Sequence, residues 1–411
     1  MFEEKFEFTS GLKKKVLYAG IAGIVLLIIG IITINLGGHG AGHGGGEEHG
    51  HAFHWTDRLW TNFWINNLYF TGIALLGVFF VAVNYAAQAG WSAGIKRIPE
   101  AFGAWLPIAG ILMLGIFLIA NHTIFHWTHE EVVAHDPILQ GKQAYLNIPF
   151  FVIRMVVFFL LWILLYRVIR KKSLEEDEKG GLNYYKVLRK YSAIFIIIFA
   201  VTSSVAAWDW GMSIDPHWFS TIYGWYYFAS WFVAGLSAIT LFVIFIKEAG
   251  YLKIVNENHY HDLGKYVFAF SVFWMYIWFS QYFLIYYSNI PEEAIYYVER
   301  MKSGIYGKYF YLNIIINFFF PFLVLMTRDS KRHGIFLKIA CVVLLAGHWL
   351  DFFLMVTPGI LKDNGGLGFM EVGMLMIYGS AFTYVVLNQL SKASLIAKNH
   401  PMLQESAHMH V

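Results

Sequence analysis

Several ionisable side chains lie within or next to long apolar stretches, and their types suit proton transfer or haem ligation. His122, His126 and His129 follow an i, i+4, i+7 spacing that predicts one shared helical face. His348 and Asp351 share a face of another apolar stretch. An ionisable group is costly in hydrocarbon, so His122, His126, His348 and Asp351 are candidates for proton transfer. His129, followed by two glutamates, fits a solvated helix end better.

Three further charged residues occupy apolar stretches: Arg154, Asp209 and Glu371. Charges at membrane depth usually pair with one another. Arg154 therefore either neutralises an acid, such as Asp209 or Asp351, or takes part in proton transfer, and the sequence favours neither reading. We add all three residues to the candidates.

A haem held by two histidines is a competing interpretation of the same residues. It needs histidines on facing helices at one depth, and His122 or His126 with His348 would meet that condition. A second haem would lack ligands, so this interpretation is the weaker one. Cys341 is the only cysteine. A single cysteine excludes a disulfide framework, a Cys-x-x-Cys-His haem attachment and an iron–sulfur cluster held by this chain alone.

The elements that position these residues are membrane-spanning helices. The chain is 58% hydrophobic and 14% charged, against about half and a quarter in soluble domains. A hydrocarbon core of roughly 30 Å takes about 20 apolar residues per helix. The sequence therefore predicts an all-α integral membrane protein with about ten transmembrane helices, near 15–36, 62–89, 101–127, 144–170, 189–210, 218–247, 264–289, 306–327, 333–356 and 366–391.

Basic residues concentrate in alternate connections, near 13–15, 96–97, 170–190, 247–253, 328–332 and 392–398. The positive-inside rule places these connections and both termini in the cytoplasm, with residues 16–36 as a retained signal anchor. The candidates then all lie in the outer half of the membrane. For the inner half we expect no buried acid or base, only polar groups such as Asn84, Gln88 and Thr240. The net charge of +3, spread over the connections, gives no support to nucleic acid as a partner.

Two polar features have structural interpretations. Asp215 and Pro216 are typical of a helix N-cap followed by proline in the first turn, and we favour this role for Asp215 over a proton relay. The glycine-rich segment 37–54 predicts only weak metal affinity and receives no function. Its histidines are His39, His43, His49, His51 and His54.

Two stretches carry a resemblance to a known family. Residues 208–221 read WDWGMSIDPHWFST, and residues 273–282 read FWMYIWFSQY, with NIPEE at 289–293. They resemble the membrane subunits of the polysulfide-reductase or NrfD-like superfamily. More narrowly, the chain is similar to the F-subunit family of bacterial alternative complex III, a quinol:cytochrome c (or high-potential acceptor) oxidoreductase. The motif residues that we single out are Asp215, Pro216, His217 and Gln281.

The resemblance implies a fold of two four-helix bundles plus two flanking helices. The expected divisions are 1–61 for the first helix and outer loop, 62–210 and 211–356 for the bundles, and 357–411 for the last helix and tail. It also implies a bacterial inner membrane protein of a respiratory chain. Such a subunit is expected to have no redox centre of its own, and to contribute to proton conduction, a quinone pocket and complex assembly. A quinone or menaquinone is the ligand that the resemblance allows.

The partners implied by the resemblance are subunits of the same complex, apart from membrane lipid. They are a second NrfD-like subunit (the C subunit), an iron–sulfur subunit, multihaem and monohaem cytochrome c subunits and small membrane subunits; a terminal oxidase is a further option. Haem and iron–sulfur clusters are expected on these partners. Two alternatives stay open: a secondary transporter with intramembrane acids, and a b-haem membrane anchor.

Overall fold

The computed structural model describes residues 4–36 and 53–409, and the part it describes is helical, without a strand. His39, His43, His49 and His51 lie outside the described residues. The α-helices are α1 (Ser10–Leu36), α2 (Trp55–Ala86), α3 (Arg97–Phe102), α4 (Leu106–Ile124), α5 (Glu130–His135), α6 (Pro137–Lys142), α7 (Ile148–Lys179), α8 (Leu182–Trp210), α9 (Tyr223–Glu248), α10 (Glu257–Ser288), α11 (Pro291–Met301), α12 (Gly307–Ile314), α13 (Phe320–Val324), α14 (Arg328–Arg332), α15 (Gly334–Leu361), α16 (Phe369–Leu390) and α17 (Leu403–Ala407).

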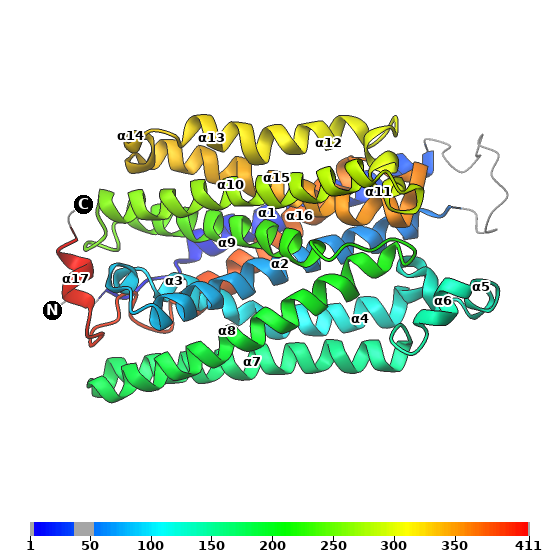
Figure 1. Ribbon diagram of the computed structural model, residues 1–411. Coiled ribbons are helices and arrows are strands. Elements are labelled where there is room, and N and C mark those ends of the chain that lie inside the picture. Colours follow the sequence, from blue (N-terminus) through cyan, green and yellow to red (C-terminus); the bar gives the residue numbers. More distant parts are fainter. Residues whose placement is uncertain (1–3, 37–52, 410–411) are drawn as a thin grey trace.

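Ten helical segments of the described chain are long and apolar enough to cross a membrane. They are α1, α2, α3 with α4, α7, α8, α9, α10, α12 with α13, α15 and α16. Each overlaps one of the ten predicted ranges, so the prediction of an all-α membrane protein is confirmed. The segments run side by side (Figure 1). Both chain ends lie at one end of the bundle, here called the terminal end, and α5, α6 and α11 lie at the opposite end.

Two helices form the buried centre of the bundle, and the others surround them. Side chains of α2 and α9 are buried along most of their length. Helix α2 packs against α4, α8, α9, α15 and α16, whereas α1 packs mainly against α16. The outer helices expose large apolar side chains, among them Ile111, Leu164 and Ile197. Apolar residues facing outward suit a surface in contact with lipid tails.

The two central helices touch through a glycine and a tryptophan. The Trp231 indole on α9 lies over Gly72 on α2, where an added Cβ would stand 1.8 Å from Trp231 Cδ1. The same indole donates a hydrogen bond to the carbonyl of Leu68 at 3.1 Å. Only glycine permits so close an approach, as is common where membrane helices pack.

Two local predictions are wrong because helices end where the sequence suggested that they continue or begin. Helix α4 ends at Ile124 and Phe125 is extended, so His122 and His126 are not on one helical face. His126 instead begins the 3₁₀ turn η3 (His126–Thr128). Asp215 caps no helix N-terminus: it follows the 3₁₀ turn η4 (Met212–Ile214), and the next helix begins at Tyr223.

Candidate functional site

A buried carboxyl group, Asp351 on α15, lies at the meeting point of four helices. Its Oδ2 accepts a hydrogen bond from Trp274 Nε1 of α10 at 2.9 Å. Its Oδ1 accepts from Asn313 Nδ2 of α12 at 2.7 Å and from the Tyr226 hydroxyl of α9. Asp351 is fully buried. Among the described residues, only neutral groups donate to it, so it is an intramembrane acid without a basic partner.

The chain of polar groups continues from Asp351 through two amides on one span. Asn317 donates to Asn313 Oδ1 at 2.6 Å. Asn317 sits in the π-helical turn η5 (Ile315–Phe319), a distortion often found at functional sites. Gly347 on α15 makes room for it, since a Cβ there would lie 2.2 Å from Asn317 Oδ1. Sequence reasoning missed both asparagines, although their i, i+4 spacing in an apolar run was a usable signal.

His348 lies beside this centre, one helical turn before Asp351. Its Nδ1 is 3.0 Å from Ser230 Oγ, and its ring meets the edge of the Trp274 indole at 5.5 Å. Its Nε2 is buried without a hydrogen-bond partner in the described part of the chain. Trp274 therefore contacts both predicted residues, His348 and Asp351, and places them in one site.

The structure does not bring the proposed haem ligands together. His122 lies at the end of α4, with Nδ1 3.1 Å from Thr128 Oγ1 and its ring 4.9 Å from that of His129. His122 and His126 are exposed, whereas His348 is fully buried. Within residues 4–36 and 53–409, no ring contact or hydrogen bond joins His348 to either of them. A haem held between these helices would require them to face each other.

Arg154 is paired with Asp209, which is one of the two acids that the sequence left open. Arg154 Nε and Nη2 lie 2.7 and 3.1 Å from the two carboxylate oxygens. The Tyr145 hydroxyl donates to Asp209 Oδ1 at 2.8 Å, and the guanidinium stacks on the Tyr145 ring at 3.9 Å. Both charged side chains are buried. A bidentate ion pair of this kind fixes α7 against α8 and stabilises both side chains in their charged forms.

Glu371 has a structural environment. Arg58 Nε and Nη2 lie 2.6 and 2.7 Å from its two oxygens, and Asn62 donates to it at 2.9 Å. The backbone N–H of Gly368 also donates to Glu371, at 2.8 Å. The side chain thus caps α16 and ties it to α2, and its oxygens are fully engaged.

The two stretches that carry the family resemblance touch each other near the end opposite the termini. Ser220 donates to the buried Gln281 at 3.3 Å. Trp218 donates to the carbonyl of Glu293 at 3.1 Å and stacks on Tyr296 with ring centres 3.9 Å apart. Residues far apart in sequence therefore build one joint between the segment that precedes α9 and helices α10 and α11.

The other motif residues belong to the rim of this joint. Asp215 Oδ2 lies 3.3 Å from Arg300 Nη2 and its Oδ1 3.8 Å from Lys362 Nζ, which accounts for this acid without a cap. The Pro216 carbonyl accepts from Lys142 at 2.5 Å. His217 is largely exposed and hydrogen-bonds the Asp136 carboxylate. Asp215 thus pairs with the buried Arg300 and the exposed Lys362, whereas His217 lies at the surface.

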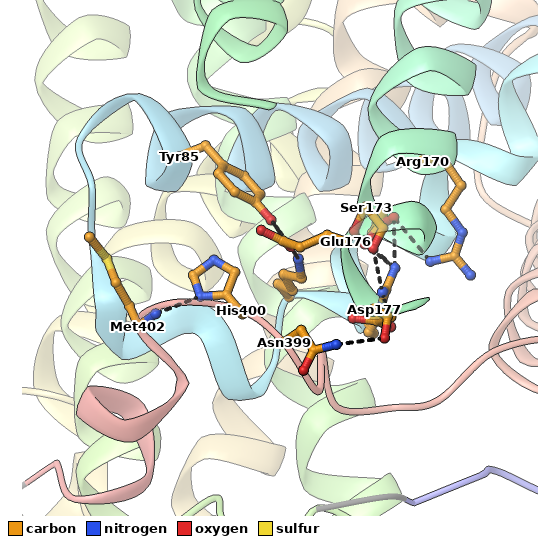
Figure 2. Close-up of polar contacts among 11 residues, drawn as sticks. Tyr85, Arg170, Ser173, Glu176, Asp177, Asn399, His400 and Met402 are labelled. Atoms are coloured by element: carbon orange, nitrogen blue, oxygen red, sulfur yellow. Dashed lines mark hydrogen bonds and ion pairs between the residues drawn. The ribbon is translucent and has the colours of Figure 1, made fainter. Parts of the chain in front are cut away.

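A second polar centre, absent from the predictions, lies at the terminal end (Figure 2). We call it the terminal-side network; it comprises three bases and three acids, Lys96, Arg97, Arg170, Glu100, Glu176 and Asp177. Lys96 Nζ is 2.9 Å from Glu176 Oε2, and the Tyr85 hydroxyl donates to the same oxygen at 3.2 Å. Burial lowers the pKa of Lys96, although Glu176 opposes that shift.

Arg97 holds the rest of the terminal-side network together. Its Nη1 is 3.2 Å from each Glu100 oxygen and 2.9 Å from Ser173 Oγ, and its Nη2 pairs with Asp177. Ser173 in turn donates to Glu100 at 3.1 Å. Arg170 Nη1 lies 3.1 Å from Glu100 Oε1. Helix α3 is locked onto α7 by these contacts.

The expectation that this half of the bundle lacks buried acids and bases is therefore wrong. Lys96, Arg97 and Arg170 look like loop charges in the sequence, but each is at least nine-tenths buried. Burial is tolerated because every base has an acid of the network beside it. Glu176 Oε1 is buried without a hydrogen-bond partner among the described residues, so the network retains an unused acceptor.

No model of a known protein family matches this chain, and a search of curated protein sequences finds no significant match. The family resemblance of the two stretches therefore remains a prediction.

Proposed function

We propose that this chain is an integral membrane subunit of a respiratory quinol:cytochrome c (or high-potential acceptor) oxidoreductase, in which it conducts protons and helps to form a quinone pocket. The observation that carries the proposal is the Asp351 centre. A fully buried acid whose hydrogen bonds all come from neutral groups can exist in both protonation states without breaking an ion pair. That property suits a proton carrier rather than a structural charge.

Polar groups in the same region would extend a proton route from Asp351 towards the terminal end. Asn313 and Asn317 continue from Asp351 along one span. Helix α9 carries buried hydroxyl groups at Ser230, Ser237 and Thr240, in the direction of the terminal end. Beyond them lies the terminal-side network, with its unused Glu176 oxygen. These groups support proton conduction over more of the bilayer than the sequence suggested.

The electron-transfer part of the proposal rests on the family resemblance. With Cys341 as its only cysteine, the chain cannot ligate an iron–sulfur cluster or attach a c-type haem by itself. Those centres would belong to iron–sulfur and cytochrome c subunits, beside a second NrfD-like subunit. Quinol oxidation at this subunit would release protons near Asp351, on the side away from the termini.

Purification in a mild detergent tests the proposal against its two alternatives. We expect the tagged chain to co-purify with subunits whose absorption spectra show c-type haem and whose iron content indicates clusters. A solitary, colourless protein would reject the complex and favour a secondary transporter. A b-haem spectrum in the isolated chain would instead favour the membrane anchor.

A further inference from the structure

A basic groove lies at the terminal end of the bundle, apart from both polar centres. It has a volume of about 340 Å³ and is formed where α2 ends and α8 begins. Three basic side chains line it, Lys186, Arg189 and Lys190, with Gln88 and two alanines. No acidic residue is part of this lining.

The described part of the chain provides no counter-charge for these three basic residues. All three are exposed. None of them makes an ion pair with a described acid, although the terminal-side network nearby pairs each of its bases. Three unpaired positive charges around one groove repel each other unless an anion binds between them.

The surface next to the groove is apolar and faces outward. Along α8, residues 186, 190, 193, 197 and 201 follow the 3–4 spacing of one helical face. On that face the bases give way to Ala193 and then to Ile197 and Val201, which are 67% and 63% exposed. The ligand that fits has an anionic head beside the bases and an apolar tail along α8.

We propose that the groove binds the phosphate headgroup of an anionic phospholipid, from the leaflet on the side of the termini. Arg189 can hold two phosphate oxygens through its planar fork, while Lys186 and Lys190 act as point charges. The acyl chains would lie along Ile197 and Val201. Basic pockets between membrane helices bind anionic headgroups in this way. The assignment is independent of the redox role proposed above.

A neighbouring groove on the same end of the bundle supplies a matched control. It is larger, about 480 Å³, and is lined by Arg167, Arg170 and Lys171, but also by Glu175 and Glu178. Its acids offset its bases. Replacing its exposed Arg167 and Lys171 removes the same two residue types, and the same charge, as replacing Arg189 and Lys190.

The test measures lipid binding to the full chain in a neutral detergent, by native mass spectrometry and by the melting temperature. We expect phosphatidylglycerol to bind and to raise the melting temperature, while phosphatidylcholine does not. Each removed charge weakens attraction about five-fold, so R189Q with K190Q weakens phosphatidylglycerol binding roughly 25-fold. The R167Q/K171Q control keeps wild-type binding. Lys186→Gln alone weakens binding about five-fold.

Three results would overturn the proposal. One is wild-type phosphatidylglycerol binding by R189Q/K190Q. Another is an equal loss in R167Q/K171Q, which would indicate diffuse attraction to any basic surface. The third is an equal rise in melting temperature with inorganic phosphate alone, which would make the groove a site for free phosphate and not for lipid.

Discussion

Replacing Asp351 by asparagine separates a proton carrier from a structural acid, and the contacts of the carboxyl group give the expected cost. Oδ1 accepts from Tyr226 and Asn313, and Oδ2 accepts from Trp274. Asparagine has one side-chain oxygen, so its amide N–H₂ must face at least one of these donors. One buried donor left unpaired costs about 1–3 kcal/mol. We expect Asp351→Asn to lower the free energy of unfolding by that amount and to fold.

Asp209→Asn is the matched control, because Asp209 is also a buried aspartate that accepts a hydrogen bond from a tyrosine hydroxyl. Its partner is a cation, and the substitution leaves Arg154 buried without a counter-charge. Breaking a buried ion pair in this way costs about 3–5 kcal/mol. Unfolding in mixed micelles should therefore show a larger loss for Asp209→Asn than for Asp351→Asn.

In the functional assay we expect the opposite order, with the larger effect for Asp351→Asn. In liposomes containing the purified complex, Asp351→Asn should lower the number of protons released per electron, because asparagine cannot take up or release a proton. Asp209→Asn should keep the ratio in whatever fraction assembles, since its charge serves the pair with Arg154. An unchanged ratio in Asp351→Asn, or a larger loss of stability there than in Asp209→Asn, would refute the reasoning.

Three further predictions concern packing, pH and the terminal-side network. Gly72→Ala places a methyl group inside the indole that covers it and should cost about 1–3 kcal/mol or more on unfolding, whereas Gly115→Ala, with open space around it, should not destabilise. Burial holds the pKa of His400 at about 2, whereas in the unfolded chain this histidine takes up a proton below about pH 6.5. The contribution of His400 to the stability of the fold is therefore complete above about pH 6.5. That stability should fall by about 1.4 kcal/mol per unit as the pH drops from there towards 2, and hydrogen exchange of residues 391–409 should report it. Glu176→Gln should cost about 3–5 kcal/mol by stranding Lys96, and replacing both by apolar residues should recover most of the loss.

Each of these predictions has an outcome that would contradict it. Equal melting temperatures for the two glycine variants would mean that α2 and α9 can separate. A pH dependence unchanged in His400→Phe would assign it to another group, such as His259, whose pKa burial also lowers and whose ring contacts Ser406. In the third case, additive losses for the single and double variants would show that Lys96 and Glu176 do not interact.

The membrane spans could be predicted from the sequence, because lipid imposes a simple rule. A backbone in hydrocarbon must satisfy its hydrogen bonds within each segment, so about 20 consecutive apolar residues imply a helix. That rule holds before any tertiary contact forms, and all ten predicted spans are present. Where a helix ends depends instead on local turns and on contacts with other segments. The predictions of a helix through His126 and of a cap at Asp215 were wrong for this reason.

The candidate site could be predicted only in part, because the sequence shows which charged residues lie at membrane depth but not which of them pair. The apolar surroundings of Arg154, Asp209 and Asp351 marked all three as intramembrane charges. The fold alone decides that Arg154 meets Asp209 while Asp351 meets three neutral donors. That difference separates a structural ion pair from a candidate proton carrier.

The terminal-side network could not be predicted from the sequence either, because its bases look like exposed loop charges there and are buried in the fold. Lys96 and Arg97 stand next to a helix start and match the loop charges that the positive-inside rule counts. Their partners Glu176 and Asp177 lie on a different helix, α7. Hydropathy describes one segment at a time, whereas a buried charge is stable only when another segment brings a counter-charge within a few ångströms. The sequence by itself determined which segments cross the membrane, and the tertiary structure decided which charges are buried.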